Sequence, residues 1–120
     1  MALHYLEFDS SEDAQGHGTF DAMASAAPAQ LPALQAEILA VLDWALQAFG
    51  EPAPLDEQGQ WDYELQGVEE TATALDVLWD AGRLQLKAGA TAAPRTTLSL
   101  TLVGTPQFCD ALRQAFGLRS

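Results

Sequence analysis

Apolar residues recur at helical spacing over one long stretch of the chain, Gln30–Phe49. The spacing predicts a helix with a single apolar stripe, formed by Leu31, Leu34, Ile38, Val41, Leu42, Ala45 and Phe49. Pro32 suits the first turn of this helix. Gly50 followed by Pro52 ends it, because glycine accepts a left-handed cap and proline cannot continue the helix.

A second helix is predicted near the end of the chain. Thr105 is a favourable N-cap, and Pro106 suits the first helical position. The helix closes at Gly117. Its apolar positions, which we expect to be buried, are Phe108, Leu112, Ala115 and Phe116.

Between the two helices the hydrophobic period changes from helical spacing to two. Four segments alternate apolar with polar residues: 61–66, 75–80, 83–88 and 97–102. A period of two places alternate side chains on opposite faces of a sheet, so each segment is predicted to be a half-buried strand. The short, turn-rich connections favour an antiparallel meander with one face on the core and one in water.

Two of these strands are predicted to form a hairpin of defined register. Trp79 should stand opposite Leu84 and Val77 opposite Leu86, because only this parity puts the large apolar residues together on the core face. The connection is then Ala81-Gly82 or the wider Asp80–Arg83. The same register places Asp80 opposite Arg83 and Asp76 opposite Lys87 on the outer face.

The N-terminal quarter of the chain is less regular. Leu3–Phe8 is aromatic and aliphatic enough for a strand, and the polar segment Asp9–Gly18 is predicted to be a loop. Thr19–Ala26 is ambiguous, since its alanines and methionine favour a helix, whereas the flanking glycines and Pro28 leave room for only two turns. We interpret it as a second strand paired with the first, with the helix as the open alternative.

Together these elements predict a single α+β domain over residues 1–120. The expected architecture is a two-layer sandwich, with an antiparallel β-meander of four or more strands and two helices packed on one face. Hydrophobic residues make up 48% of the chain, which is sufficient for a core of this kind.

The charge is strongly acidic and unevenly distributed. The chain has 17 acidic and 5 basic residues, for a net charge of −12, and all of the Lys and Arg follow Asp80. Nucleic acids and anionic membranes bind through basic side chains, so both are excluded as expected partners. A charged partner should be a basic protein, and self-association is the other candidate.

The remaining composition favours a cytoplasmic protein. Cys109 is the single cysteine, which excludes an internal disulfide. Met1–Phe8 contains no Lys or Arg, unlike the start of a secretory signal peptide. The longest aliphatic run, Ile38–Leu42, is far shorter than the roughly 20 residues of a membrane span.

Candidate metal-binding and catalytic residues are few. The loop Asp9–Phe20 has acidic or hydroxyl residues at alternate positions, as in a calcium loop, but Ala14 stands where such a loop needs glycine and Phe20 where it needs glutamate. We interpret the segment as a solvated loop, with cation binding left open. His4, His17 and Cys109 are the only candidates for a nucleophile and base. No known cofactor or hydrolase signature occurs, so we predict no catalytic residues, no metal site and no cofactor.

The leading hypothesis is a non-enzymatic protein-interaction module, such as an inhibitor, an immunity protein or a chaperone-like protein. Trp44 is the large residue of the long helix that stands off the apolar stripe, about 120° from Ile38. The candidate interaction face consists of Trp44, Asp62, Glu64, Asp76, Arg83 and Lys87. The alternative is an enzyme or small-molecule-binding protein, with a pocket between the sheet and the long helix lined by Trp61, Tyr63 and Trp79.

Overall fold

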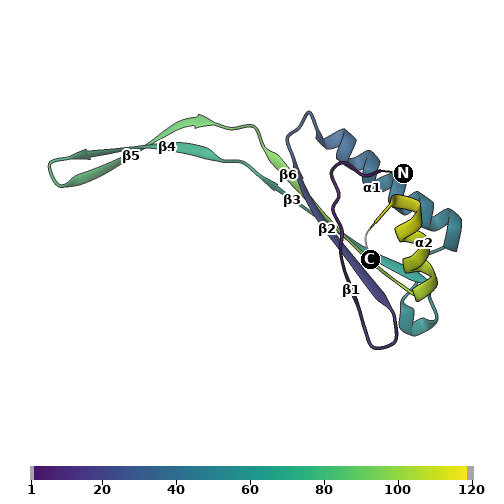
Figure 1. The fold of residues 1–120 in the computed structure, drawn as a ribbon. Coiled ribbons are helices and arrows are strands. Elements are labelled where there is room, and N and C mark those ends of the chain that lie inside the picture. The colour runs from purple at the N-terminus through teal and green to yellow at the C-terminus, as the bar shows by residue number, and fades with distance from the viewer. Residues whose placement is uncertain (1, 119–120) are drawn as a thin grey trace.

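The computed structural model describes residues 2–118 and confirms the α+β class. Figure 1 shows two helices beside a curved arrangement of antiparallel strands. In chain order the elements are β1 (Asp9–Glu12), β2 (Gly18–Ala26), α1 (Leu31–Phe49), the short 3-10 helix η1 (Leu55–Glu57), β3 (Trp61–Glu70), β4 (Thr73–Asp80), β5 (Arg83–Thr91), β6 (Arg95–Gly104) and α2 (Pro106–Phe116).

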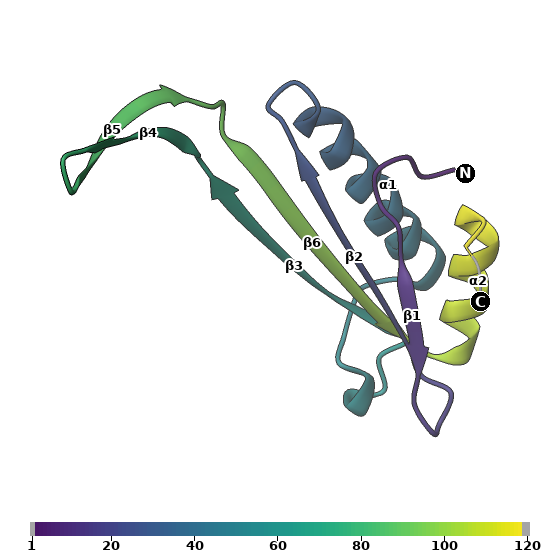
Figure 2. The same ribbon diagram turned by 60° about the vertical axis from the view of Figure 1, so that its left-hand side comes forward.

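The strands form two separate sheets. Four of them make an antiparallel sheet in the order β1-β2-β6-β3, in which β6 pairs with β2 on one side and β3 on the other. The other two, β4 and β5, pair only with each other. Figure 2 shows this two-stranded ribbon leaving the larger sheet at the end where α1 begins. We call Thr73–Thr91 the arm and the rest of the described chain the body.

The predicted meander is wrong, because the chain does not turn back between β3 and β4. Trp61 to Gly104 forms one long hairpin, in which β6 returns beside β3 and β5 beside β4. At the junction with the arm, the Ala92 N–H donates to the Ala72 carbonyl at 2.8 Å, so the two strands remain linked there. The hairpin reverses only at Ala81-Gly82, where φ is 48° and 82°. Two consecutive positive φ angles are characteristic of the type I′ turn, one of the two common two-residue hairpin turns.

The core lies on one face of the four-stranded sheet. Phe20 stands opposite Leu102 and Ala22 opposite Leu100, and all four side chains are buried. Trp61 is buried on the same face. The helices complete this single cluster with Leu34, Ile38, Val41 and Ala45 from α1 and Phe108, Cys109, Leu112 and Phe116 from α2. Both helices therefore direct the apolar stripes predicted from their periodicity toward the core, where the predicted residues Leu31, Leu42, Phe49 and Ala115 are only partly buried.

The capping predicted for the second helix is also present. The Thr105 hydroxyl accepts a hydrogen bond from the Phe108 N–H at 3.3 Å, and Gly117 ends the helix in the left-handed conformation. The long helix ends at Gly50, whose φ of 81° and ψ of −162° differ from the left-handed cap predicted there. The positions of both helices are confirmed.

Trp44 belongs to an aromatic cluster between the two helices, and its expected position off the core is wrong. Its ring lies 5.9 Å from Phe49, 5.9 Å from Phe108 and 5.6 Å from Phe116, measured between ring centroids. The angular positions of residues around the long helix predict burial against a single packing partner, the sheet. The second helix packs beside the first and partly buries the tryptophan as well.

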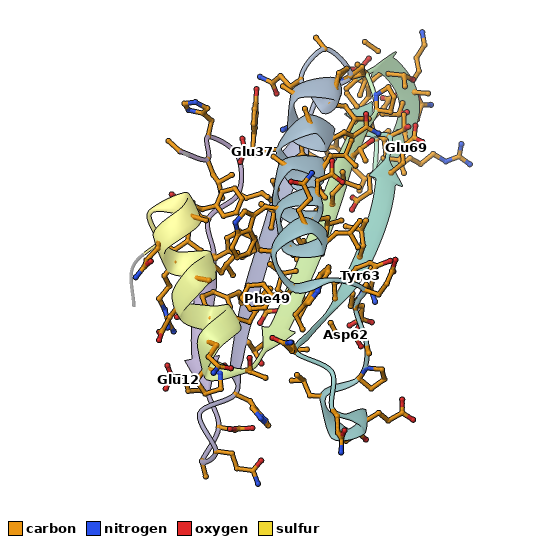
Figure 3. All side chains as sticks on the ribbon, turned by 90° about the vertical axis from the view of Figure 1, so that its right-hand side faces the viewer. Glu12, Glu37, Phe49, Asp62, Tyr63 and Glu69 are labelled. Atoms are coloured by element: carbon orange, nitrogen blue, oxygen red, sulfur yellow. The ribbon has the colours of Figure 1, made fainter. Side chains whose placement is uncertain are left out.

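The first strand differs from the prediction. Leu3–Phe8 is not a strand, and β1 lies within the segment predicted to be a loop. Thr19–Ala26 is a strand, as preferred, but β2 pairs with Asp9–Glu12 and β6. An ion pair of 3.2 Å between Glu12 and Arg113 links β1 to α2. Figure 3 shows Glu12 near the start of that helix. Every residue of β1 is exposed, so it has no hydrophobic pattern by which to be recognised.

The Leu3–Phe8 segment is held instead by one carboxylate of α1. Glu37 accepts hydrogen bonds from the backbone N–H groups of His4, Tyr5 and Leu6, at 3.0, 2.9 and 2.8 Å. Leu6 is thereby placed in the core, where it is 3% exposed. In a strand these N–H groups would donate to a neighbouring strand. Here they donate to the side chain of Glu37 instead.

We expect Glu37→Ala to lower the free energy of unfolding by about 2 kcal/mol, because it leaves part-buried N–H groups without a charged acceptor. Chemical denaturation measures this change, and hydrogen exchange should show faster exchange of the Tyr5 and Leu6 amides. Asp43→Ala is the control, since it removes an equal charge from an exposed position of the same helix. Equal effects of the two substitutions would contradict the prediction.

Candidate protein interaction surface

The arm has the predicted register. Trp79 stands opposite Leu84 and Val77 opposite Leu86, and the connection is Ala81-Gly82. Directly opposed residues share a face of a ribbon, and alternate residues of a strand point to opposite faces. The arm therefore has one face that is almost entirely apolar and one that is mostly polar.

We define the apolar arm face as the six residues of β4 and β5 that share this side of the ribbon. They are Leu75, Val77, Trp79, Leu84, Leu86 and Ala88. The prediction that this face lies on the core is wrong, because Trp79 is 80% and Leu84 70% exposed. Figure 1 shows the arm extending away from both helices, and the described chain measures 67 × 31 × 25 Å. No element of the body is placed to cover this face.

The opposite face of the arm carries three of the residues predicted for an interaction surface. Asp76 stands opposite Lys87, and Asp80 opposite Arg83. The ion pairs found among residues 2–118 lie elsewhere, at His17–Asp13, Arg113–Glu12 and Arg113–Asp110. With two acidic and two basic residues the arm is formally neutral, so the whole net charge of −12 belongs to the rest of the chain.

Asp62 and Glu64 lie on a different surface, the outer face of the four-stranded sheet. They stand opposite Val103 and Thr101 of β6, on the side away from the core. Figure 3 shows Asp62 and Glu69 along β3, at the edge of the sheet. Across the same outer face, the Thr101 hydroxyl donates to Asp21 at 2.6 Å. The predicted surface residues thus occupy two places, the outer sheet face and the polar face of the arm, while Trp44 lies between the helices.

This concentration of acids on the body should make the fold sensitive to salt. Raising sodium chloride from about 10 mM to several hundred mM shortens the Debye length from roughly 30 Å to less than 8 Å. We expect the melting temperature to rise, because screening relieves repulsion among acids that is stronger in the folded state than in the expanded one. Thermal melts followed by circular dichroism measure it.

The variant Asp62→Asn/Glu64→Gln provides the matched comparison. It removes two neighbouring charges from the outer sheet face and should reduce the increase caused by salt. A melting temperature that is unchanged or falls in the wild-type chain would show that the acids are already balanced in the folded protein.

The three aromatic residues proposed to line a pocket are not brought together. Trp61 is buried, stacks on Phe108 at 5.7 Å between ring centroids, and donates from Nε1 to the Gly50 carbonyl at 2.9 Å. Tyr63 is half exposed on the edge strand β3, and Trp79 is on the arm. Trp61 is thus a core residue rather than part of a binding pocket.

The hollows on the body are surface depressions rather than enclosed cavities. One of about 510 Å³ lies between the β1–β2 turn and η1, and it is lined by Asp13, His17, Asp56 and Asp62 among others. Hydrogen bonds from the backbone N–H of Gln15, and also of His17, hold the pKa of Asp13 below its usual value. Within residues 2–118, no three His, Cys, Asp or Glu side chains are grouped to hold a metal ion.

Cys109 is not joined to either histidine by a hydrogen bond in the described chain. Its thiol is 2% exposed and donates to the Gly104 carbonyl at 3.5 Å, and burial raises its pKa. His17 pairs with Asp13 at 3.4 Å, and His4 contributes its backbone N–H to Glu37. A buried thiol of raised pKa is a weak nucleophile.

Between residues 2 and 118 there is no helix long and apolar enough to cross a membrane. Comparisons of this chain with protein-family models, with curated proteins and with solved structures find no match.

Proposed function

We propose that this chain is a non-enzymatic, cytoplasmic protein-interaction module, of an inhibitor, immunity or chaperone-like type, and that the arm is its binding element. The body, a two-layer sandwich with both helices on one face of the sheet, serves as the scaffold. The observation that carries the proposal is the apolar arm face, because a contiguous exposed apolar surface of this kind on a strongly acidic protein marks a site of association.

The construction of the arm supports a binding role. A two-stranded ribbon alone in water is marginally stable, and it needs a further strand or layer against its apolar side. Trp79 is the most exposed of the large residues on the apolar arm face, and tryptophan is enriched at the energetic centres of protein interfaces. A partner that covers this face would stabilise the arm and remove Trp79 from water.

The distribution of charge supports different roles for the outer face of the sheet and for the arm. The acidic outer face of the sheet, which includes Asp62 and Glu64, favours a basic protein partner, whereas the neutral arm has no such preference. Nucleic acids and anionic membranes are disfavoured by the same charge. The alternative of a small-molecule site lined by Trp61, Tyr63 and Trp79 has lost its geometric support, since these residues lie in three different environments.

Affinity capture with matched variants tests the proposal. The wild-type chain, Trp79→Ser and Leu78→Ser are used as baits in a lysate of the organism that makes the protein, and retained proteins, including further copies of this chain, are quantified. Leu78 is the control, because it is adjacent in sequence and 55% exposed but lies on the polar face of the arm. We expect Trp79→Ser to lose retained proteins that Leu78→Ser keeps. Identical retention by all three baits would contradict a binding role for the apolar arm face.

A further inference from the structure

We propose that the apolar arm face packs against the same face of a second copy of this chain, which makes the protein a two-fold symmetric dimer joined arm to arm. This inference rests on the proposed function of the arm as the binding element. It adds the identity of the occupant and the geometry of the contact.

The apolar arm face is complementary to itself when two arms run antiparallel. Its largest cross-strand pair, Trp79 with Leu84, lies next to the tip, and its smallest pair, Leu75 with Ala88, lies nearer the body. Consider a two-fold axis that lies between the two ribbons, perpendicular to the strands and level with the central pair, Val77 with Leu86. This axis places the largest pair of each copy over the smallest pair of the other. Leu84 of one copy then lies over Ala88 of the other, and the indole of Trp79 lies over Leu75, beside the space that Ala88 leaves.

Charge favours this contact over any contact between the bodies. The arms are neutral, so the net charge of −12 of each chain lies outside its arm. Antiparallel arms put the two bodies at opposite ends of the contact, separated by roughly 25 Å of strand, which is longer than the Debye length of about 8 Å at physiological salt. A basic protein would instead be attracted to the body, so charge does not select it as the occupant of the arm.

The polar arm residues also fit this geometry. Asp76, Arg83 and Lys87 lie on the face opposite the contact, so dimerisation leaves these charges in water. Two ribbons packed face to face stand about 10 Å apart and give each arm the second layer that a lone hairpin lacks.

The surface area that the two arms would bury against each other predicts a reversible dimer. Covering Trp79 removes roughly 150–200 Å² from water, and covering the four large aliphatic residues removes roughly 60 Å² each. The total for both copies, on the order of 800 Å², belongs to weak and reversible complexes rather than permanent ones. We therefore expect dissociation in the micromolar range.

Sedimentation equilibrium of the purified chain, from about 1 to 500 µM, tests the association. The mass should rise with concentration from 12.8 kDa toward twice that value. Val77→Asp should raise the dissociation constant roughly 100-fold or more, because two carboxylates would face each other without partners at the axis. Leu78→Asp adds the same charge to the opposite face and should leave the dimer intact. The thermal melt of the body serves as the folding control for both variants.

Chemical crosslinking tests the geometry. In a Cys109→Ala background, Val77→Cys should be crosslinked between copies by a bifunctional maleimide of roughly 10 Å reach, the distance between packed sheets. Leu78→Cys should not, because its two copies would lie on the outer sides of the paired ribbons. Equal crosslinking at both positions would contradict the face-to-face contact.

The outcomes separate this inference from the proposed function. A wild-type chain that stays monomeric at about 500 µM, or a dimer that survives Val77→Asp, overturns the arm-to-arm dimer. If host proteins are nevertheless retained by the wild-type chain and lost with Trp79→Ser, the arm remains a binding element with another occupant. If neither association nor capture depends on the apolar arm face, both proposals fail.

Discussion

A chain that ends at Gly104 is expected to be unfolded. It lacks α2, whose side chains Phe108, Leu112 and Phe116 are at most 5% exposed in the core. Each such side chain contributes roughly 1.5–3 kcal/mol through burial, and a typical domain is stable by about 5–15 kcal/mol in total. Removing the helix also uncovers Trp44 and Trp61, which pack against Phe108. Circular dichroism and thermal melting measure the loss.

A deletion of similar size elsewhere provides the control. Removing Thr73–Thr91 and joining Ala72 to Ala92 through an Asn-Gly turn deletes only exposed residues, and the two ends are already linked by a hydrogen bond of 2.8 Å. We expect this armless chain to melt cooperatively. A soluble fragment ending at Gly104 with a cooperative transition would contradict the role assigned to α2.

Gly104→Ala is expected to destabilise the protein by about 1–3 kcal/mol through overpacking. Gly104 stands between Gly18 of β2 and Trp61 of β3 in the sheet. A Cβ atom at position 104 would lie 2.7 Å from Cγ and 2.9 Å from Cβ of Phe108. Phe108 is fully buried and its ring is stacked on Trp61, so it has little room to move. Urea denaturation measures the change.

Gly67→Ala is the matched comparison for this substitution. Gly67 lies on the neighbouring strand, where an added Cβ would meet the end of the flexible Leu98 side chain at 3.0 Å and the Thr97 carbonyl oxygen at an ordinary contact distance of 3.9 Å. Its effect should be small or favourable, since glycine weakens a strand interior. A stability of Gly104→Ala within about 0.5 kcal/mol of wild type would show that the helix can shift without cost.

The elements that follow from local periodicity could be predicted from the sequence. The two helices have apolar stripes and end at glycine, and the four strands of the long hairpin have a period of two. The Ala81-Gly82 turn then sets the register of the arm, because a shift by one residue would mix its two faces. These features depend on neighbours in sequence and need no knowledge of the rest of the fold.

What could not be predicted depends on which surfaces meet. The alternation of Leu75, Val77 and Trp79 shows that these residues share a face, but the same pattern results whether that face covers the protein's own core or meets a second chain. The position of Trp44 depends on α2, and the conformation of Leu3–Phe8 depends on the carboxylate of Glu37, 31 residues beyond Leu6. For the candidate surface, the available signal was the combined length of the four segments with a period of two, 61–66, 75–80, 83–88 and 97–102. It exceeds what helices of 19 and 11 residues can cover.

The long hairpin also sets an order in which the chain should fold. Its tightest turn, Ala81-Gly82, brings together residues only a few positions apart, so pairing can begin there and extend toward both ends within microseconds. The pairing of β2 with β6 is different, because Asp21 and Thr101 are 80 residues apart and closing such a loop is slow. The arm should therefore exist, with its apolar face in water, before the sheet of the body has closed. A newly made chain would present this face to its surroundings first, and encounter with another chain would not have to wait for the body to fold.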